Sequence, residues 1–423
     1  MTVDSDLNVL VIAQYFPPDL GGAAIRAYNV AKGLLLNGCK VTVVAAFPHY
    51  PYGEIPKEYR WKLVKVERLG GIRVVRTFMP PIGSRGFCNR LLLIGVFAVT
   101  SLFALPWVGG VDVIWATSWV PGIVYGKVKR RPVAINVDDL TIEDVIDLRL
   151  IDENSLITKI AERVYRFFYV KGDAVTPISL GYIETISRKY CVDKSRIHVV
   201  RGGVDLSIFK PSPSSRHAGQ KFVVLYTGVF GPGYDFDQIF RASKIVEEKI
   251  GDVEFVLHGG GEHLVYIKDQ IKEQNLTNVK LSERILNDKK EVVELLNAAD
   301  VLILPMKDYG HPYLGIAMKI YEYQAVGKPI ICCAEGQPAT YIRETGSGIL
   351  VKPGDHEALA KAVLYLKENP LIAMKMGESG RHYVESNLSI EKIGLKMMAA
   401  FNEVLRNPSR LRKAEQQVAR AKK

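Results

Sequence analysis

The chain has 423 residues, more than one hydrophobic core usually supports, so two domains are expected. Its apolar fraction of 48% and charged fraction of 24% are those of a globular protein and exclude a disordered one. The net charge of +11 favours anionic partners, and because no aromatic-plus-basic motif accompanies it, nucleic acid is not expected among them.

Short apolar segments alternate with helical periodicity along the first half of the chain. A strand is expected at 8–13 and a helix at 24–37, which ends at Gly38. Further buried strands are expected at 41–46, 72–76, 111–116, 133–137 and 174–177. This alternation predicts an α/β fold with a parallel, doubly wound sheet.

The same alternation restarts after residue 220. Its strands are expected at 221–227, 253–258, 279–281, 301–304 and 330–332. Residues 210–220, KPSPSSRHAGQ, have the composition of a linker or exposed loop. We therefore predict an N-terminal domain at 1–205, a C-terminal domain at 206–390, and a helix with a basic tail at 391–423 that packs toward the first domain. Two such Rossmann-like domains are expected to face each other across a cleft, at the carboxyl ends of their strands.

The stretch 315–331, GIAMKIYEYQAVGKPII, carries the most informative pair of charges. Lys319 and Glu322 are three residues apart, so a helix places them on one face. A buried strand precedes them at 299–305, and Gly327 allows the helix to end tightly. Lys319 can neutralise a diphosphate, and Glu322 can accept hydrogen bonds from a ribose diol. A solvated surface pair is the alternative interpretation.

Glycines follow three of the predicted strands: Gly21 and Gly22, then Gly228, then Gly259 and Gly260. Their backbone N–H groups could bind phosphate, or they could form ordinary turns. The first cluster lacks the Gly-x-Gly-x-x-Gly pattern with a downstream acid, which argues against a dinucleotide-dependent oxidoreductase.

These features together resemble the retaining glycosyltransferases of family 4, which have the GT-B fold. Residues 15–44 are similar to the opening glycine loop and first helix of that family, and 317–331 to its nucleotide-diphosphate site. Residues 49–55 (HYPYGEI) and 138–145 (DDLTIEDV) resemble the branch that acts on lipid-linked glycans, where Asp-Leu-Trp-Pro is usual in place of DLTI. Residues 196–211 resemble the interdomain segment, with Arg-Gly at 201–202 in place of Pro-Asn.

The resemblance implies transfer of a sugar from a nucleotide diphosphate sugar, with uridine expected as the base, to a hydroxyl of a lipid-linked or glycan acceptor. Retention of configuration and independence of metals and cofactors are also implied. The implied donor-binding residues are Gly21, Gly22, Gly228, Gly259, Gly260, Leu314, Gly315, Lys319 and Glu322. Leu314 stands where the family usually has the first Glu of Glu-x7-Glu, so no carboxylate orients the sugar there. Lys319 would be the main cation for the leaving diphosphate, with Arg201, Arg26 or Arg241 as possible helpers.

Three further residues are candidates for the chemistry. Asp138 and Asp139 directly follow the strand at 133–137, where a carboxylate could stabilise the ring cation or accept the acceptor proton. One of them could instead cap the next helix. His49 is a candidate on the acceptor side, with a structural or exposed histidine as the alternative.

Residues 91–108, LLLIGVFAVTSLFALPWV, are uncharged over the length of a membrane span. The strands near residues 8 and 111 should share one sheet, which excludes a single crossing. A helix at the membrane surface, ended by Pro106, is favoured over a core helix or a re-entrant hairpin. Leu91, Leu92, Phe97 and Phe103 would then contact the membrane or the acceptor.

The C-terminal tail is rich in cations that could bind anionic lipid, or could simply be solvated. They are Arg406, Arg410, Arg412, Lys413, Arg420, Lys422 and Lys423. The start of the chain lacks a signal-peptide pattern, and the five cysteines lack metal-type spacing, so a reduced, cytoplasmic protein is expected. We therefore expect a peripheral enzyme on the cytoplasmic membrane face.

Two other classes stay open at this point. A GT-B sugar-nucleotide epimerase would need neither an acceptor nor a membrane. A non-catalytic sugar-nucleotide-binding protein would explain both Leu314 and the lack of a basic residue between 228 and 240.

Overall fold

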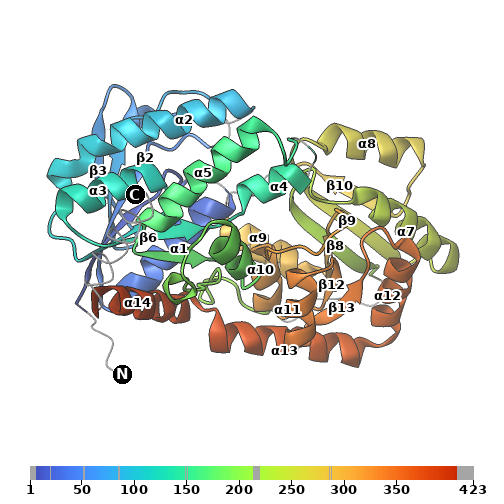
Figure 1. Cartoon of the computed structure of the whole chain (residues 1–423). Coiled ribbons are helices and arrows are strands. Elements are labelled where there is room, and N and C mark those ends of the chain that lie inside the picture. Colours follow the sequence, from blue (N-terminus) through green and yellow to red (C-terminus); the bar gives the residue numbers. More distant parts are fainter. Residues whose placement is uncertain are drawn as a thin grey trace. The chain divides into compact units, whose positions relative to one another are not determined.

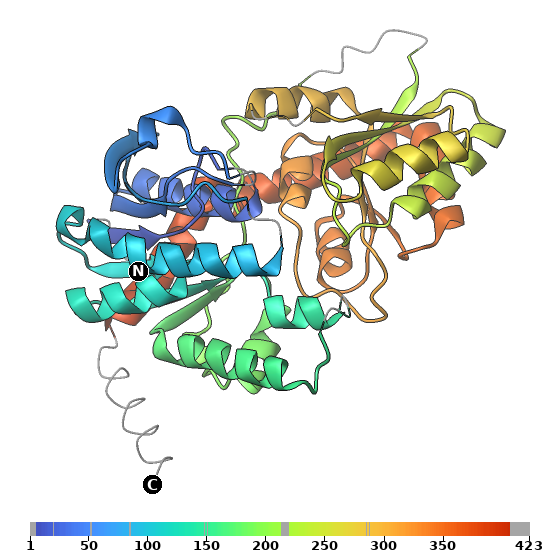
Figure 2. The ribbon, with the colours of Figure 1, turned by 90° about the horizontal axis from the view of Figure 1, so that it is seen from above.

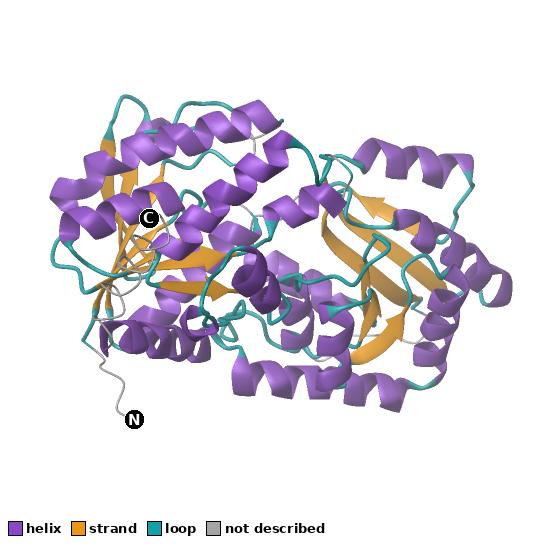
Figure 3. Cartoon of the chain, in the orientation of Figure 1, coloured by secondary structure: helices purple, strands orange, loops and turns teal. Residues whose placement is uncertain are grey.

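The computed structural model describes residues 6–19, 21–50, 53–83, 86–147, 149, 151–212, 220–284, 286 and 288–406. The chain forms two compact units, one of residues 1–203 with 390–423 and one of residues 204–389. The boundaries predicted from the sequence are 205/206 and 390/391. Each unit is an α/β layer structure, with strands flanked by helices on both faces of the sheet (Figures 1 and 3).

The first unit contains a seven-stranded sheet in the order β3-β4-β2-β1-β5-β6-β7. All neighbouring strands pair in parallel except β3, which is antiparallel to β4 at one edge. The strands are β1 (Asn8–Ile12), β2 (Lys40–Ala46), β3 (Val64–Leu69), β4 (Ile72–Thr77), β5 (Val113–Ala116), β6 (Val133–Val137) and β7 (Ala174–Pro177). The central strands are buried on both faces, as continuous apolar runs require in a parallel sheet.

Helices of the first unit cover both faces of this sheet. They are α1 (Gly22–Leu36), α2 (Phe87–Thr100), α3 (Trp119–Lys129), α4 (Thr141–Asp147), α5 (Leu156–Lys171), α6 (Tyr182–Glu184) and α14 (Ile390–Arg406). Short helical turns are η1 (Lys57–Tyr59), η2 (Ser101–Trp107), η3 (Thr185–Lys189) and η4 (Lys194–Arg196). The connection from β1 to β2 runs in one direction along the sheet, and those from β4 through β7 run in the other. Right-handed crossovers therefore place α1 on one face and α2, α3 and α5 on the opposite face.

The last helix, α14, returns to the first unit and packs against α1. The crossing depends on two glycines, because a Cβ on Gly33 would lie 2.1 Å from the carbonyl oxygen of Ile390. A Cβ on Gly394 would lie 2.3 Å from the backbone of Gly33. Only glycine permits backbones to approach so closely. The C-terminal helix is therefore part of the N-terminal unit.

The second unit contains a six-stranded, all-parallel sheet in the order β10-β9-β8-β11-β12-β13. Its strands are β8 (Phe222–Val229), β9 (Val253–Gly260), β10 (Val279–Ser282), β11 (Val301–Pro305), β12 (Ile330–Cys333) and β13 (Gly348–Val351). Its helices are α7 (Phe236–Lys249), α8 (Leu264–Glu273), α9 (Lys289–Ala298), α10 (Lys319–Ala325), α11 (Gln337–Thr345), α12 (His356–Glu368) and α13 (Pro370–Asn387). The predicted doubly wound α/β architecture is confirmed in both units, while the strands β3 and β13 were not predicted.

Candidate functional site

Lys319 is the first residue of α10, and its ammonium group is buried between aromatic rings. Nζ lies 4.1 Å from the ring centre of Tyr226 and 4.3 Å from that of Tyr234. These faces attract the cation, but Nζ has no hydrogen-bond partner among the described residues. Burial lowers the pKa of Lys319 to about 7, against the opposing effect of Glu322. The ammonium group is therefore positioned by rings that leave its N–H donors available to an anionic ligand.

Glu322 lies on the same face of α10 as Lys319, as the spacing predicted. Burial raises the pKa of Glu322, whereas Lys289 and Lys319 lower it. Burial therefore disfavours the charged form of both side chains of the predicted pair. An anionic ligand beside Lys319 would restore the charged form of the lysine.

Two glycines form the backbone beneath Lys319. Gly228 and Gly259 are paired neighbours near the carboxyl ends of β8 and β9, with φ of +130° and +147°. A Cβ on Gly259 would lie 1.9 Å from the carbonyl oxygen of Gly228. A Cβ on Gly228 would lie 3.1 Å from Nζ of Lys319. Glycine at both positions therefore lets the two strand ends meet under the ammonium group, and Gly260 follows directly on β9.

Leu314 and Gly315 lie in the loop between β11 and α10. Leu314 is exposed and Gly315 is buried. The N–H of Tyr313 donates to the carbonyl of Glu335 at 3.3 Å, and the N–H of Gln337 donates to the carbonyl of Tyr313 at 2.7 Å. These bonds fix the loop against the segment that follows β12.

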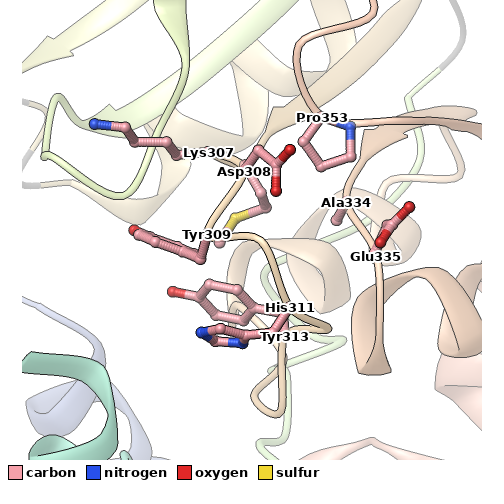
Figure 4. Close-up of a pocket in the computed structure, with 9 residues that line it drawn as sticks. Lys307, Asp308, Tyr309, His311, Tyr313, Ala334, Glu335 and Pro353 are labelled. Carbon is pink, nitrogen blue, oxygen red and sulfur yellow. The ribbon is translucent and has the colours of Figure 1, made fainter. Parts of the chain in front are cut away.

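A small hollow opens beside this loop (Figure 4). It is lined by Met306, Lys307, Asp308, Tyr309, His311, Tyr313, Ala334, Glu335 and Pro353. The ring of Tyr309 lies 5.6 Å from that of Tyr313 and 6.4 Å from that of His311. The hollow combines aromatic faces with hydrogen-bonding groups, and the lining residues follow β11, β12 and β13 at the carboxyl edge of the sheet.

In the first unit, the glycine pair lies at the start of α1. Gly21 is the N-terminal flanking residue with φ of +108°, and helix α1 begins at Gly22. Both glycines are exposed, and the described side chains provide no cap for the first turn. The N–H groups at this end of a 15-residue helix are the type of donors that bind anions.

Arg26, also in α1, is a buried cation whose contacts hold the fold together. Its side chain is only 2% exposed, and Nε lies 2.6 Å from Oδ1 of Asp138. Nη2 donates to Oδ1 of Asn136 at 3.0 Å and to the carbonyl oxygen of Val200 at 2.8 Å. Arg26 therefore joins α1 to the end of β6 and the segment around residue 200. Arg26 would have to give up these contacts to bind a diphosphate, as the predicted helper role requires. Arg241, another predicted helper, lies exposed on α7.

Asp138 and Asp139 lie where predicted, directly after β6, but in different environments. Asp138 is compensated by Arg26. Asp139 keeps solvent exposure, yet the surrounding protein and the charge of Asp138 raise the pKa of Asp139 to about 6. Asp144 on α4 is half-buried, and its burial together with the charge of Asp139 raises the pKa of Asp144 to about 7. Asp139 is thus better suited than Asp138 to exchange a proton near neutral pH.

His49 lies after β2 and is buried rather than exposed. Nδ1 donates to the carbonyl oxygen of Phe47 at 2.8 Å, and the ring stacks on Tyr15 at 5.5 Å. Oδ1 of Asp19 accepts hydrogen bonds from the backbone N–H groups of His49 and Tyr50, both at 2.8 Å. Nε2 of His49 is buried without a hydrogen-bond partner in the described part of the chain. These contacts give His49 a structural role, and its predicted acceptor-side role stays a prediction.

Helix α2 and the turn η2 contain the apolar segment predicted to contact a membrane. Leu91, Leu92 and Phe103 are exposed, at 52%, 49% and 46%. Phe97 is only 1% exposed and belongs to the core, so its placement in the membrane-contacting set is wrong. The α-helix ends at Thr100, and Pro106 lies within η2 rather than ending the helix.

Residues Cys88–Trp107 have the length and apolar composition of a membrane span, and 28% of an 18-residue part of this segment is buried. The strands on either side, β4 and β5, belong to one sheet, which confirms that the segment does not cross a membrane once. Several predicted features fall outside the described residues: the first five residues, 51–52, 213–219, and all tail cations beyond Arg406.

Within the described ranges, no three His, Cys, Asp or Glu side chains gather in a way that could hold a metal ion. Sequence reasoning missed Tyr226, Tyr234 and the partnership of Arg26 with Asp138. The two tyrosines flank the Gly228 loop in the motif YTGVFGPGY, which was the available signal. The partners Arg26 and Asp138 are too distant in sequence for any local pattern to reveal them.

Two protein-family models match consecutive parts of the chain. The model described as "Glycosyltransferase Family 4" matches residues 20–208, and the model described as "Glycosyl transferases group 1" matches residues 208–383. Together they follow the two units of the structure.

Curated relatives and solved structures that resemble the chain are also glycosyltransferases or sugar-synthesising enzymes by their names. The chain is 24% identical, over 90% of its length and 94% of the relative, to a GDP-mannose-dependent alpha-(1-6)-phosphatidylinositol monomannoside mannosyltransferase of Mycolicibacterium smegmatis. It is 24% identical, over 49% of its length and 54% of the relative, to an Escherichia coli UDP-Gal:alpha-D-GlcNAc-diphosphoundecaprenol alpha-1,3-galactosyltransferase. The structure of sucrose-phosphate synthase from Thermosynechococcus elongatus matches with a TM-score of 0.72, covering 94% of this chain and 99% of that one at 19% identity. The chain therefore belongs to the family 4 glycosyltransferases and is a glycosyltransferase with the GT-B fold.

Proposed function

We propose that the protein transfers a sugar from a UDP-sugar to a hydroxyl group of a lipid-linked glycan, with retention of configuration and without a metal. In this reaction the bond between the anomeric carbon and the diphosphate oxygen breaks. The acceptor oxygen bonds to that carbon on the same face, and the acceptor proton passes to the leaving diphosphate or to a protein carboxylate.

The single observation that carries the proposal is the unpaired, buried ammonium group of Lys319. A lysine with a pKa near 7 and no hydrogen-bond partner is costly to the fold, so its location favours a role toward an anion. Negative charge grows on the diphosphate as it leaves, and Lys319 would stabilise that charge more in the transition state than in the bound donor. Gly228 and Gly259 allow the phosphates to approach the strand ends, and Gly21 and Gly22 offer backbone donors.

Asp139 is the carboxylate we assign to the acceptor side of the chemistry. Its raised pKa, about 6, leaves it ionised at neutral pH yet able to take up a proton. Glu322 is assigned to the ribose of the donor, from its place one helical turn from Lys319. We assign Asp138 a structural role, because it pairs with Arg26.

Two observations support a lipid-linked acceptor and a peripheral position on the cytoplasmic membrane face. Apolar side chains of α2 and η2 are exposed, which is costly unless a partner covers them. The names of both curated relatives also specify lipid acceptors, a phosphatidylinositol mannoside and a diphosphoundecaprenol-linked sugar. Their donors differ in the base, so the uridine preference is the part of the proposal that an assay must decide first.

The test is a transfer assay with the purified protein, labelled UDP- and GDP-sugars, and lipid extract from the source organism. Label that becomes organic-extractable with one donor, and not with the Lys319→Met variant, would support the proposal and identify the sugar. Transfer from a GDP-sugar alone would replace the donor assignment. No transfer by a protein that still binds nucleotide would contradict it. In that case, release of an altered sugar without acceptor would indicate an epimerase, and its absence a binding protein.

A further inference from the structure

Helix α5 presents an apolar stripe on its outward face. Leu156, Ile157, Ile160, Val164 and Phe167 are between 47% and 71% exposed. Their spacing places all five on one side of the helix. The opposite side packs into the unit through Thr158 and Tyr169, which are fully buried. The stripe is therefore not needed to complete the core of this unit.

A row of cations borders this stripe. Lys159, Arg163 and Arg166 are exposed and follow one another at helical spacing, and Lys171 is exposed at the end of the helix. The one acidic residue of α5, Glu162, is partly buried and pairs with Lys189 at 2.8 Å. The exposed side of α5 thus carries four cations and no carboxylate.

The stripe continues a wider apolar surface. Helix α3 contacts both α2 and α5, so the three helices form one layer on the same face of the sheet (Figures 1 and 2). Thirteen of the 28 exposed large apolar side chains in the described chain belong to α2, η2, α3 and α5. On the opposite face, α1 and α14 expose only Leu36 and Leu395 among their described large apolar residues. Among the helices that cover the two faces of the sheet, apolar exposure is therefore concentrated in one layer, although loops and the edge strand β3 expose others such as Trp61 and Leu63.

We propose that α5, together with the outward faces of α2 and η2, forms a docking surface for a bilayer that contains anionic lipid. Helices that lie in a membrane interface combine an apolar face with Lys and Arg, and the absence of exposed acids on α5 suits anionic headgroups. Leu156, Ile160, Val164 and Phe167 would insert among the acyl chains, while Lys159, Arg163 and Arg166 bind the phosphates. This inference rests on the proposed lipid-acceptor function and extends it. It adds α5 to the membrane-contacting surface and specifies that the bound lipid is anionic.

The test is flotation of the full chain with vesicles of phosphatidylcholine alone, or of phosphatidylcholine with phosphatidylglycerol. We expect binding to the anionic vesicles that weakens as salt is added. The triple change Lys159→Gln, Arg163→Gln and Arg166→Gln should weaken binding roughly 100-fold. The triple change Ile160→Gln, Val164→Gln and Phe167→Gln should abolish it. Two triple variants in the second unit are the matched controls, and both should float like the wild type. The first combines Lys244→Gln, Lys249→Gln and Lys272→Gln. The second combines Val265→Gln, Leu371→Gln and Met374→Gln.

Equal flotation of the wild type and both α5 variants would overturn the proposal, and equal binding to neutral vesicles would overturn the role of the basic row. A wild type that never floats, but is dimeric until the stripe is changed, would show that a second copy covers the stripe instead. Thermal unfolding and nucleotide binding of each variant confirm that it is folded. Flotation without any transfer would contradict the proposed function but support the docking surface. Transfer in detergent without flotation would support the proposed function but contradict the docking surface.

Discussion

Two buried cations of this protein, one in each unit, have opposite surroundings. Nitrogen atoms of the Arg26 guanidinium group, in the first unit, lie within 3.0 Å of Asp138, of Asn136 and of the carbonyl oxygen of Val200. Lys319 of the second unit contacts only aromatic faces and has no hydrogen-bond partner in the described structure. Arg26 is thus paired directly with a carboxylate, whereas the charge of Lys319 is only partly offset, by Glu322.

We interpret this difference as that between a charge that serves the fold and a charge that serves the proposed ligand. A buried cation that is paired with a carboxylate and carbonyl groups costs less, but removing it leaves those partners unpaired. A buried cation without hydrogen bonds costs stability, and that cost falls when an anion binds or when the group loses its proton. The two residues should therefore respond in opposite ways to the same substitution, and the predictions below use that contrast.

The largest effect should follow from Lys319→Met. Loss of the ammonium group that we propose to face the leaving diphosphate should lower kcat about 100- to 1,000-fold, the usual result of removing one stabilising donor from a developing negative charge. Single-turnover transfer with the donor found above measures this. Lys244→Met, at an exposed lysine on α7 of the same unit, is the control and should leave kcat within about twofold. Comparable losses in both variants would show that general charge, and not this position, matters.

Arg26→Met should act on the fold instead. It leaves Asp138 and Asn136 without their partner, so the free energy of unfolding should fall by about 3–5 kcal/mol. Thermal melting should then drop by about 10 °C, at about 2–4 °C per kcal/mol for a unit of this size. Arg241→Met on the exposed face of α7 is the control. Adding Asp138→Leu to Arg26→Met should recover part of the loss, because the carboxylate that had lost its partner is then removed as well. Full stability of the single variant would contradict the comparison.

A pH effect should distinguish Lys319 further. Its pKa of about 7 in the free protein should rise when a diphosphate binds, so binding takes up a proton. The Kd for a nucleoside diphosphate should therefore increase from pH 7 to pH 9, by up to about tenfold per pH unit. Calorimetric titration in buffers of different ionisation enthalpy measures both the affinity and the proton uptake. The Lys319→Arg variant, which stays charged throughout, should lose this dependence, and a wild type with flat affinity would exclude the titration of Lys319 as its cause.

The same contrast explains how much of the site the sequence could predict. The helix with Lys319 and Glu322, and the glycines at neighbouring strand ends, depend on local spacing and strand alternation, and both are found as predicted. The partners of Arg26 lie more than 100 residues away, and no local pattern joins them. Phe97 was misplaced because a uniformly apolar helix does not indicate which of its faces is buried. The edge strand β3 and the short strand β13 were missed because neither has a continuous buried apolar run.

The smallest expected effect is also the sharpest test of the comparison, because its sign is unusual. In the unfolded chain Lys319 binds its proton up to its ordinary pKa of 10.5, but in the folded protein only up to about 7. The unfolded state therefore binds more protons between these values, and the wild type gains stability as pH rises from 7 toward 10.5. Lys319→Met removes this penalty but also removes the stabilising contacts of Nζ with the rings of Tyr226 and Tyr234, so the variant should melt only a few degrees above the wild type at pH 7. The gap should narrow as the pH approaches 10. Differential scanning calorimetry of both proteins without ligand, at each pH, measures the gap directly. A methionine variant that melts below the wild type at pH 7 would mean that the ammonium group stabilises the fold, and Lys319 would then belong with Arg26.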